Sequence, residues 1–273
     1  MNLSNKDIEN IKKFSNKLAI YSCEIISKAK TSHIGSVLSI RDILSLIFYK
    51  YLKFDKKKLI FNNSLVLSKG HAGAGFYVSL FLKGIIGEKK LFTYCKNGSK
   101  FFGHITKNSD YGIEFSTGSL GHGLPFAVGL ALSDKINNKE KKIFVIMSDG
   151  EWDEGSNWEA LLFASHHKLN NLNILIDYNN LQSLTTVKKT LNLQPFKQKI
   201  QSFGCKCHEV NGHSIKEINA SLSKKNFNKP NVIICNTIKG KGVKFMENKV
   251  LWHYRSPNKK ELKDALKELK NER

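Results

Sequence analysis

The sequence lacks the features that mark several special classes of protein. None of its five cysteines belongs to a CxxC pair, so neither a disulfide framework nor a zinc ribbon is indicated. Cys205, Cys207 and His208 lie close together, but their spacing does not match the common zinc sites. The longest apolar runs, such as residues 143–147, fall far short of the ~20 residues that span a bilayer. The polar N-terminus has no apolar signal core, and we therefore expect a cytoplasmic protein with no membrane partner.

Proline is also scarce, with four residues in 273, and the chain has no internal repeat, proline-rich linker or low-complexity block. Apolar residues make up 41% and charged residues 25%, which is an ordinary globular mixture and argues against a disordered chain. The length is enough for one large domain or two small ones with a substantial core.

Acidic residues are few relative to basic ones. The 44 lysines and arginines exceed the 23 aspartates and glutamates, which gives a net charge of +21. Such a charge suits nucleic acid, an acidic protein partner or phosphorylated substrates. The basic residues are spread along the chain in short runs such as Lys56–Lys58, and no nucleic-acid-binding motif accompanies them. We therefore predict no nucleic-acid partner, and a basic binding module stays as an alternative interpretation.

The spacing of apolar residues predicts helices in the first half of the chain. Ile8, Ile11 and Phe14 begin a series with three- and four-residue spacings, which predicts an amphipathic helix over residues 6–30. Further helices are predicted over residues 39–53, 70–83 and 123–137.

From residue 142 onward, short apolar runs alternate with helical segments. Such runs are typical of parallel strands that are buried on both faces. The order strand, helix, strand predicts an α/β fold with a mostly parallel central sheet flanked by helices. The predicted strands cover residues 142–147, 172–176, 205–210 and 232–237, and the predicted helices cover residues 157–168, 214–224 and 259–271.

Oxygen-bearing side chains follow two neighbouring strands of this pattern. Asp149 comes directly after the strand at 142–147, and Asn179 follows the next strand, one βαβ unit later. In open parallel sheets, ligands gather at the carboxyl ends of the strands. We therefore expect the two side chains to project side by side at the ligand-binding edge of the sheet.

These side chains predict the chemistry of the ligand. A carboxylate, an amide oxygen and backbone carbonyls are hard ligands, which suit Mg²⁺ or Ca²⁺. Gly150 would let a diphosphate approach the backbone, and the positive N-terminus of the following helix would face the same phosphates. An Asp-Gly pair is also an ordinary turn, so this pair alone does not decide between the two interpretations.

Longer motifs around these residues resemble those of a known enzyme family. The stretch SDGEWDEGSNWEALLFASHHKLNNLNILIDYNN is similar to the thiamine-diphosphate signature, a strand-ending Asp-Gly followed one βαβ unit later by Asn-Asn. The segments TSHIGSVLS, LSKGHAGAGFY, FFGHIT, STGSLGHGLPFAVGLAL, TIKGKGVKFMEN and WHYRSP resemble, in order and spacing, the N-terminal half of transketolase. The resemblance covers about residues 10–260 and implies a single diphosphate-binding domain over residues 1–273.

The resemblance also assigns ligands to a cofactor and a metal. It implies that thiamine diphosphate binds with Mg²⁺, for which Ca²⁺ or Mn²⁺ can substitute. The implied metal ligands are Asp149, Asn179 and, through its backbone carbonyl, Leu181. The residues implied to contact the cofactor are His71, Gly118, Ser119, Leu120, Asp149, Gly150, Glu151, Asn179, Lys239 and His253.

The same resemblance assigns catalytic roles. It implies that His33, His104 and His253 face the sugar substrate or the reacting carbon of the cofactor. It makes Glu154 the glutamate that links paired active sites across a subunit interface. The other histidines lie outside such motifs, and we expect them to be structural; they are His122, His166, His167, His208 and His213.

Transketolases of this family have two further domains that the sequence does not contain. The missing pyrimidine-binding domain supplies a glutamate that activates the cofactor, so the resemblance implies that this chain is inactive alone. We expect a second subunit that carries the pyrimidine-binding and C-terminal domains, in an α2β2 heterotetramer.

The reaction implied is the transfer of a two-carbon ketol unit from a ketose or ketose phosphate to an aldose or aldehyde acceptor. Two other enzyme activities stay open, namely a deoxyxylulose-phosphate-synthase-like reaction and the decarboxylation of a 2-oxoacid. The basic binding module and a non-catalytic assembly subunit are the alternatives from other classes.

Overall fold

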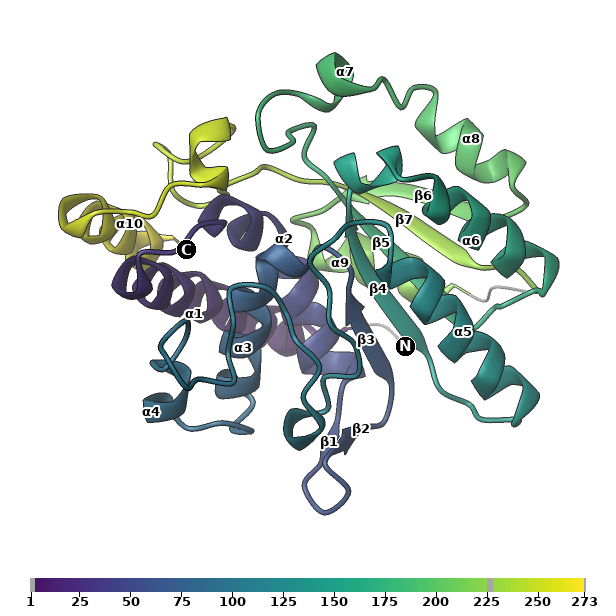
Figure 1. Cartoon of the computed structure of the whole chain (residues 1–273), viewed down its shortest axis with the longest axis horizontal. Coiled ribbons are helices and arrows are strands. Elements are labelled where there is room, and N and C mark those ends of the chain that lie inside the picture. The colour runs from purple at the N-terminus through teal and green to yellow at the C-terminus, as the bar shows by residue number, and fades with distance from the viewer. Residues whose placement is uncertain (1–2, 225–227, 273) are drawn as a thin grey trace.

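A five-stranded parallel sheet forms the centre of the computed structural model, which describes residues 3–224 and 228–272 (Figure 1). All four neighbouring strand pairs run parallel, which confirms the expected α/β sheet. In spatial order the strands are β3 (Ser64–Leu67), β4 (Ile143–Ser148), β5 (Leu172–Tyr178), β7 (Asn231–Asn236) and β6 (Lys206–Asn211). The edge strand β3 was not predicted, because four residues are too few to show a period.

Alternate residues of the strands face two separate hydrophobic cores. In β4, Phe144 and Ile146 belong to one core, and Val145 and Met147 belong to the other. Because successive side chains of a strand point to opposite faces, both faces of the sheet must be covered. The helices over one face are α1 (Asn5–Ala29), α2 (Ile34–Leu46), α3 (Gly73–Leu82) and α9 (Ile215–Ser223), and those over the other are α5 (Gly123–Ile136), α6 (Gly155–His166) and α8 (Phe196–Ser202).

Most of the predicted helices are confirmed to within a few residues, and the second helix is the exception. It begins at Ile34 rather than at residue 39, and a π-helical turn, Ile47–Tyr51, follows it. Every residue of α2 is buried, so the helix has no solvent-exposed face. The periodicity that marks a surface helix is therefore missing, and the sequence pattern gave no signal for its start.

Several short elements were not predicted because they span only one or two turns or a few paired residues. They are the hairpin β1 (Phe54–Asp55) and β2 (Ile60–Phe61), the helices α4 (Glu88–Leu91) and α7 (Val187–Thr190), and helix α8. Among the described residues, no helix combines the length and the apolar character needed to cross a membrane. The cytoplasmic location stays a prediction.

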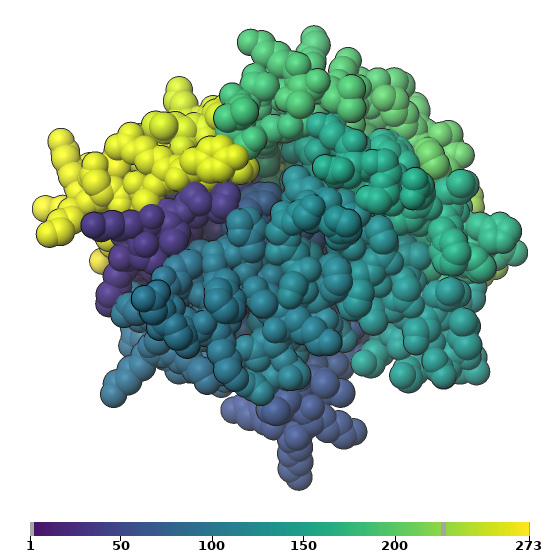
Figure 2. Space-filling model, viewed as in Figure 1, coloured from purple at the N-terminus to yellow at the C-terminus, as the bar shows by residue number. Residues whose placement is uncertain are grey.

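The C-terminal part of the chain packs against the N-terminal helix. Helix α10 (Lys259–Asn271) packs along α1, and Figure 2 shows this yellow segment against the purple one, with a recess where yellow, green and teal surfaces meet. The Ser27 hydroxyl donates a hydrogen bond to the carbonyl of Pro257 at 2.8 Å. The backbone N–H of His33 donates to the carbonyl of His253 at 2.8 Å, so these contacts bring two distant motifs together.

The central strand supplies a test of this fold. Ile174 is fully buried in the core beneath α5 and α6, so Ile174→Ala should lower the free energy of unfolding by about 2–5 kcal/mol. Ile136 is 69% exposed, and Ile136→Ala should change stability little. Chemical denaturation of both variants measures their free energies of unfolding. An equal loss of stability in the two variants would contradict this placement of the core.

Candidate active site

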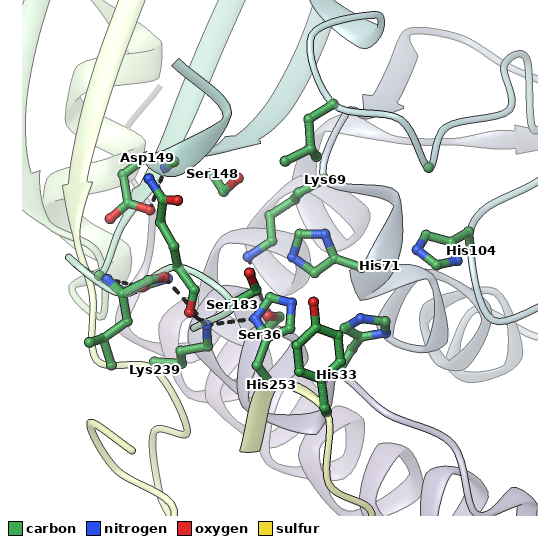
Figure 3. A pocket seen from close by; sticks show the side chains of 17 residues that line it. His33, Ser36, Lys69, His71, His104, Ser148, Asp149, Ser183, Lys239 and His253 are labelled. Carbon is green, nitrogen blue, oxygen red and sulfur yellow. Dashed lines mark hydrogen bonds between the residues drawn. The ribbon is translucent and has the colours of Figure 1, made fainter. Parts of the chain in front are cut away.

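A pocket of about 390 Å³ opens at the carboxyl edge of the sheet. In Figure 3, Ser148 and Asp149 lie at one end, His104 lies at the other, and Lys69 and Lys239 lie between them. The segments that follow β3, β4, β5 and β7 all contribute to its walls, as expected for an open parallel sheet. The predicted site residues that line it are His33, His71, His104, Gly118, Leu120, Asp149, Gly150, Asn179, Leu181, Lys239 and His253.

Asp149 and Asn179 form one end of the pocket, called here the polar end. The two residues lie together there, as the strand pattern predicted. Asp149 is buried, and its carboxylate accepts hydrogen bonds from the N–H of Gly150 at 2.8 Å and of Asn180 at 2.5 Å. Burial and the neighbouring Asp177 raise the pKa of Asp149 from its ordinary 3.8 to about 7. Because the ionised form is disfavoured here, a bound cation would stabilise it.

This donor set fits a hard divalent cation. The carboxylate of Asp149, the side-chain oxygen of Asn179 and the carbonyl of Leu181 are all oxygen ligands of the kind that Mg²⁺ prefers. The Lys239 ammonium group directs an N–H toward the Leu181 carbonyl at 3.3 Å. Across residues 3–224 and 228–272, no three His, Cys, Asp or Glu side chains form a ready metal cluster. A metal here would therefore depend on amide and carbonyl oxygens and on oxygens of a bound ligand.

Gly150 lies beneath the side chain of Gln182. A Cβ atom at position 150 would lie 2.7 Å from Gln182 Cγ, so a larger residue here would displace the Gln182 side chain. The Gln182 amide donates to Asp153 Oδ2 at 2.7 Å, which holds the side chain in place. A diphosphate that approaches the Gly150 backbone therefore requires the Gln182 side chain to move.

Two buried lysines give the pocket a positive centre. Lys69 forms an ion pair with the buried carboxylate of Asp177. Lys239 is 1% exposed and donates to the carbonyls of Leu181 and Gln182 at 3.3 Å and to Nδ1 of His253 at 2.9 Å. Burial and the Lys69 charge lower the pKa of Lys239 to about 8. Since none of these acceptors carries a negative charge, the site favours an anionic ligand next to Lys239.

Four predicted histidines surround the other end of the pocket. The ring centroid of His33 lies 5.3 Å from that of His71, 5.4 Å from that of His104 and 5.1 Å from that of His253. Burial, assisted by neighbouring charges, lowers the pKa of His33 to about 4 and that of His253 to about 3. Burial and Lys69 also lower the pKa of His71 well below its usual range. These three rings are therefore neutral at pH 7 and can both donate and accept hydrogen bonds, as a hydroxyl-rich ligand requires.

His33 occupies a strained position that supports this arrangement. It is the N-cap of α2 and has φ of 78°, in the left-handed region that non-glycine residues seldom occupy. Such strained residues are common at functional sites, where the surrounding structure holds them in place. Here the hydrogen bond from His33 N–H to the His253 carbonyl fixes the turn.

Three predicted site residues lie outside the pocket lining. Glu151 is buried, and its carboxylate accepts hydrogen bonds from Ser68 Oγ, from the Gly121 N–H at 3.2 Å and from the Ser148 N–H at 3.3 Å. These hydrogen bonds attach the loop that contains Gly118 to the end of β4, and the predicted cofactor contact of Glu151 stays a prediction. Ser119 lies in the same loop, next to Gly118, and is exposed.

Glu154 is exposed at the surface, where it is the N-cap of α6 without a side-chain capping bond. It does not line the pocket of this chain. Its predicted role at a subunit interface stays a prediction.

Several lining residues were not singled out from the sequence. Each lies within or beside a motif that was recognised, so motif position was the available signal. They are Ser36, Lys69, Ser148, Gln182, Ser183 and Tyr254. Among the histidines expected to be structural, His213 bonds to the Asp42 carboxylate at 2.8 Å and accepts from the Ile238 N–H at 2.9 Å, next to Lys239.

The family model for the transketolase thiamine diphosphate binding domain matches residues 11–271. The chain belongs to this family. It is 42% identical over 243 residues to one of the subunits of the apulose-4-phosphate transketolase of Actinobacillus succinogenes, covering 88% of each chain. It is 34% identical over 262 residues to the 6-deoxy-6-sulfo-D-fructose transketolase subunit SqwG of a Clostridium species, covering 94% of this chain and 95% of that one.

Solved structures of transketolases share the fold. The transketolase from Campylobacter jejuni superposes with a TM-score of 0.89 at 30% identity. The match covers 99% of this chain but only 43% of the Campylobacter chain. The present chain thus corresponds to one part of the longer transketolases and to nearly the full length of the Actinobacillus and Clostridium subunits.

The raised pKa of Asp149 leads to a prediction about stability. The folded chain retains a proton that the unfolded chain releases near pH 3.8, so the contribution of Asp149 to stability falls as pH rises from about 4 to about 7. At pH 8 without metal, Asp149→Asn should therefore melt a few degrees above the unsubstituted chain. Mg²⁺ should raise the melting temperature of the unsubstituted chain but not that of the variant. An equal Mg²⁺ effect on both would contradict the ligand assignment.

The uncompensated charge of Lys239 leads to a second prediction. Lys239→Met should weaken the binding of inorganic pyrophosphate with Mg²⁺ about 10- to 100-fold, the value of a charge-assisted hydrogen bond. Lys241→Met is the matched control, because Lys241 pairs with Glu247 outside the pocket lining. Calorimetry should also show that affinity falls above about pH 8 for the control but not for Lys239→Met. The same pH dependence in both variants would contradict this role.

Proposed function

We propose that this chain is the diphosphate-binding subunit of a thiamine-diphosphate-dependent transketolase. Its reaction would transfer a two-carbon ketol unit from a ketose or ketose-phosphate donor to an aldose or aldehyde acceptor. One observation carries the proposal: a single pocket combines oxygen ligands at one end, two buried lysines in the centre and neutral histidines at the other end. The relatives named as transketolase subunits, matched over nearly their whole length, support it.

The polar end of the pocket would hold the diphosphate and its metal. Asp149, Asn179 and the Leu181 carbonyl would bind Mg²⁺, and Ca²⁺ or Mn²⁺ could replace it. Lys239 would neutralise the phosphates, with Gly150 and the loop at Gly118 and Leu120 beside them. When bound, thiamine diphosphate supplies the carbanion chemistry that amino-acid side chains cannot supply.

The histidine end would bind the sugar. Rings that are neutral at pH 7 can accept a proton from one hydroxyl and donate to another without bringing a charge into the pocket. The ammonium group of Lys239 donates to Nδ1 of His253, so the proton of the neutral ring lies on Nε2, where it can serve as a donor. His33 and His104 would complete the set of donors and acceptors around the substrate hydroxyls.

A second subunit would complete the active site. We propose that it carries the pyrimidine-binding and C-terminal domains and forms an α2β2 assembly with this chain. Segments that form the pocket also carry exposed apolar side chains, including Phe102, Leu184, Leu251 and Tyr254, with Leu184 81% exposed. Large apolar side chains that are exposed on the segments that form a pocket favour a covering partner. Glu154, exposed at the N-cap of α6, would lie at a subunit interface and link paired active sites.

Native mass spectrometry tests this proposal on the chain purified from its own source, with Mg²⁺ and thiamine diphosphate present. We expect a complex that contains a second chain and the mass of the cofactor. A solitary chain without cofactor, under conditions that preserve complexes, would overturn the proposal. Turnover of the complex with ketose phosphates, compared with pyruvate, then distinguishes ketol transfer from the decarboxylating alternatives.

The assembled enzyme allows a test of the sugar-binding role. His104→Ala should lower kcat about 100-fold or more, the range expected for loss of a general acid or base, while thiamine diphosphate binds as before. His122→Ala is a suitable control, because His122 is exposed and lies outside the pocket lining. Steady-state kinetics and cofactor titration measure both quantities, and undiminished kcat would remove His104 from the catalytic set.

A further inference from the structure

Asp177 lies directly beside the pocket residues, and the sequence motifs gave it no role. It belongs to the end of β5 and is fully buried, with 0% exposure. One carboxylate oxygen accepts hydrogen bonds from Ser39 Oγ at 2.5 Å and from Thr237 Oγ1. The other accepts from the Lys69 ammonium group and from the Asn179 side-chain amide at 3.0 Å. Asp177 therefore acts as an acceptor at every contact that the structure describes for its side chain.

These contacts determine which way the Asn179 amide faces. An amide group has a donor end and an acceptor end, and a carboxylate can only accept from it. The Asn179 nitrogen must therefore face Asp177, and it also lies 3.3 Å from Ser39 Oγ. The Asn179 oxygen is left on the other side, where it accepts from the Leu181 N–H at 3.0 Å. That side belongs to the pocket, which Asn179 and Leu181 both line.

We propose that Asp177 is a positioning residue that turns the oxygen of Asn179, and not its nitrogen, toward the metal. A reversed amide would point N–H groups at a cation and repel it. This inference rests on the proposed function, because it takes Asn179 as a metal ligand. Asp177 does not line the pocket itself, so it acts through Asn179.

A purely structural role for Asp177 has a different signature. In that case the carboxylate would matter only because it neutralises the buried Lys69, and removal of the Lys69 charge would remove the need for it. In the positioning role, the need for Asp177 persists without Lys69 and disappears without the Asn179 side chain. Double-variant cycles separate the two roles, because each cycle measures the coupling of Asp177 to one partner.

The experiment measures Mn²⁺ affinity of the assembled enzyme with thiamine diphosphate present, from the loss of the free-ion EPR signal. Asp177→Asn keeps the shape of the side chain but allows either end of the amide to face Asn179. We expect its Mn²⁺ affinity to fall about tenfold, both alone and in a Lys69→Met background. In an Asn179→Ala background, Asp177→Asn should cause no further loss. Asp177→Asn alone leaves the buried charge of Lys69 without its partner and could therefore unfold the protein. The Lys69→Met background removes that charge, so the double variant is the one to measure if the single variant is unstable.

Two results would overturn the positioning role. One is that the loss caused by Asp177→Asn disappears in the Lys69→Met background, and the other is that it persists in full in the Asn179→Ala background. Failure of the unsubstituted enzyme to bind Mn²⁺ would instead count against the proposed function, so the two failures are distinguishable. Thermal melting of each variant confirms that affinities are compared between folded proteins.

Discussion

The buried ion pair of Lys69 and Asp177 joins the segments from which the pocket is built. Removing two charges from water costs several kcal/mol for each ion, and the cost is offset only when geometry is good and the remaining polar groups are satisfied. Here Ser39, Thr237 and Asn179 supply the additional hydrogen bonds. The donors come from α2, from the segments after β3 and β7, and from the end of β5, so the pair is stable only when all four are in place. The pocket walls therefore form together with the core of the fold.

The charges around the pocket are poorly compensated within the chain, and this has a consequence for binding. The raised pKa of Asp149 reflects a buried carboxyl beside another carboxylate, and the lowered pKa of Lys239 reflects a buried ammonium group beside another cation. A metal ion bound to a diphosphate would supply a cation to one and an anion to the other. The affinities for metal and diphosphate should therefore be coupled, since each ligand relieves an unfavourable charge that the other does not.

Much of the fold was predictable because its signals are local. Apolar runs of the right length indicated β4, β5 and β7, and the shared edge of parallel strands predicted that Asp149 and Asn179 meet. The strand β3 and the true start of α2 were missed, because a four-residue strand and a fully buried helix have no readable period. The roles of Lys69 and Asp177 were missed for another reason. Both lie in recognised motifs, but a motif does not show which of its side chains form an ion pair with a distant segment.

The sequence by itself determined the alternation of strands and helices, the residues at the ends of the strands and the motifs of the family. Only the tertiary structure decided the strand order, the closeness of His33 and His253, the position of Gln182 over Gly150 and the placement of Glu151 outside the pocket. The physical reason is the range of the interactions. Periodicity and strand ends are set by neighbours along the chain, whereas side-chain contacts at the pocket depend on packing between segments that are far apart in sequence.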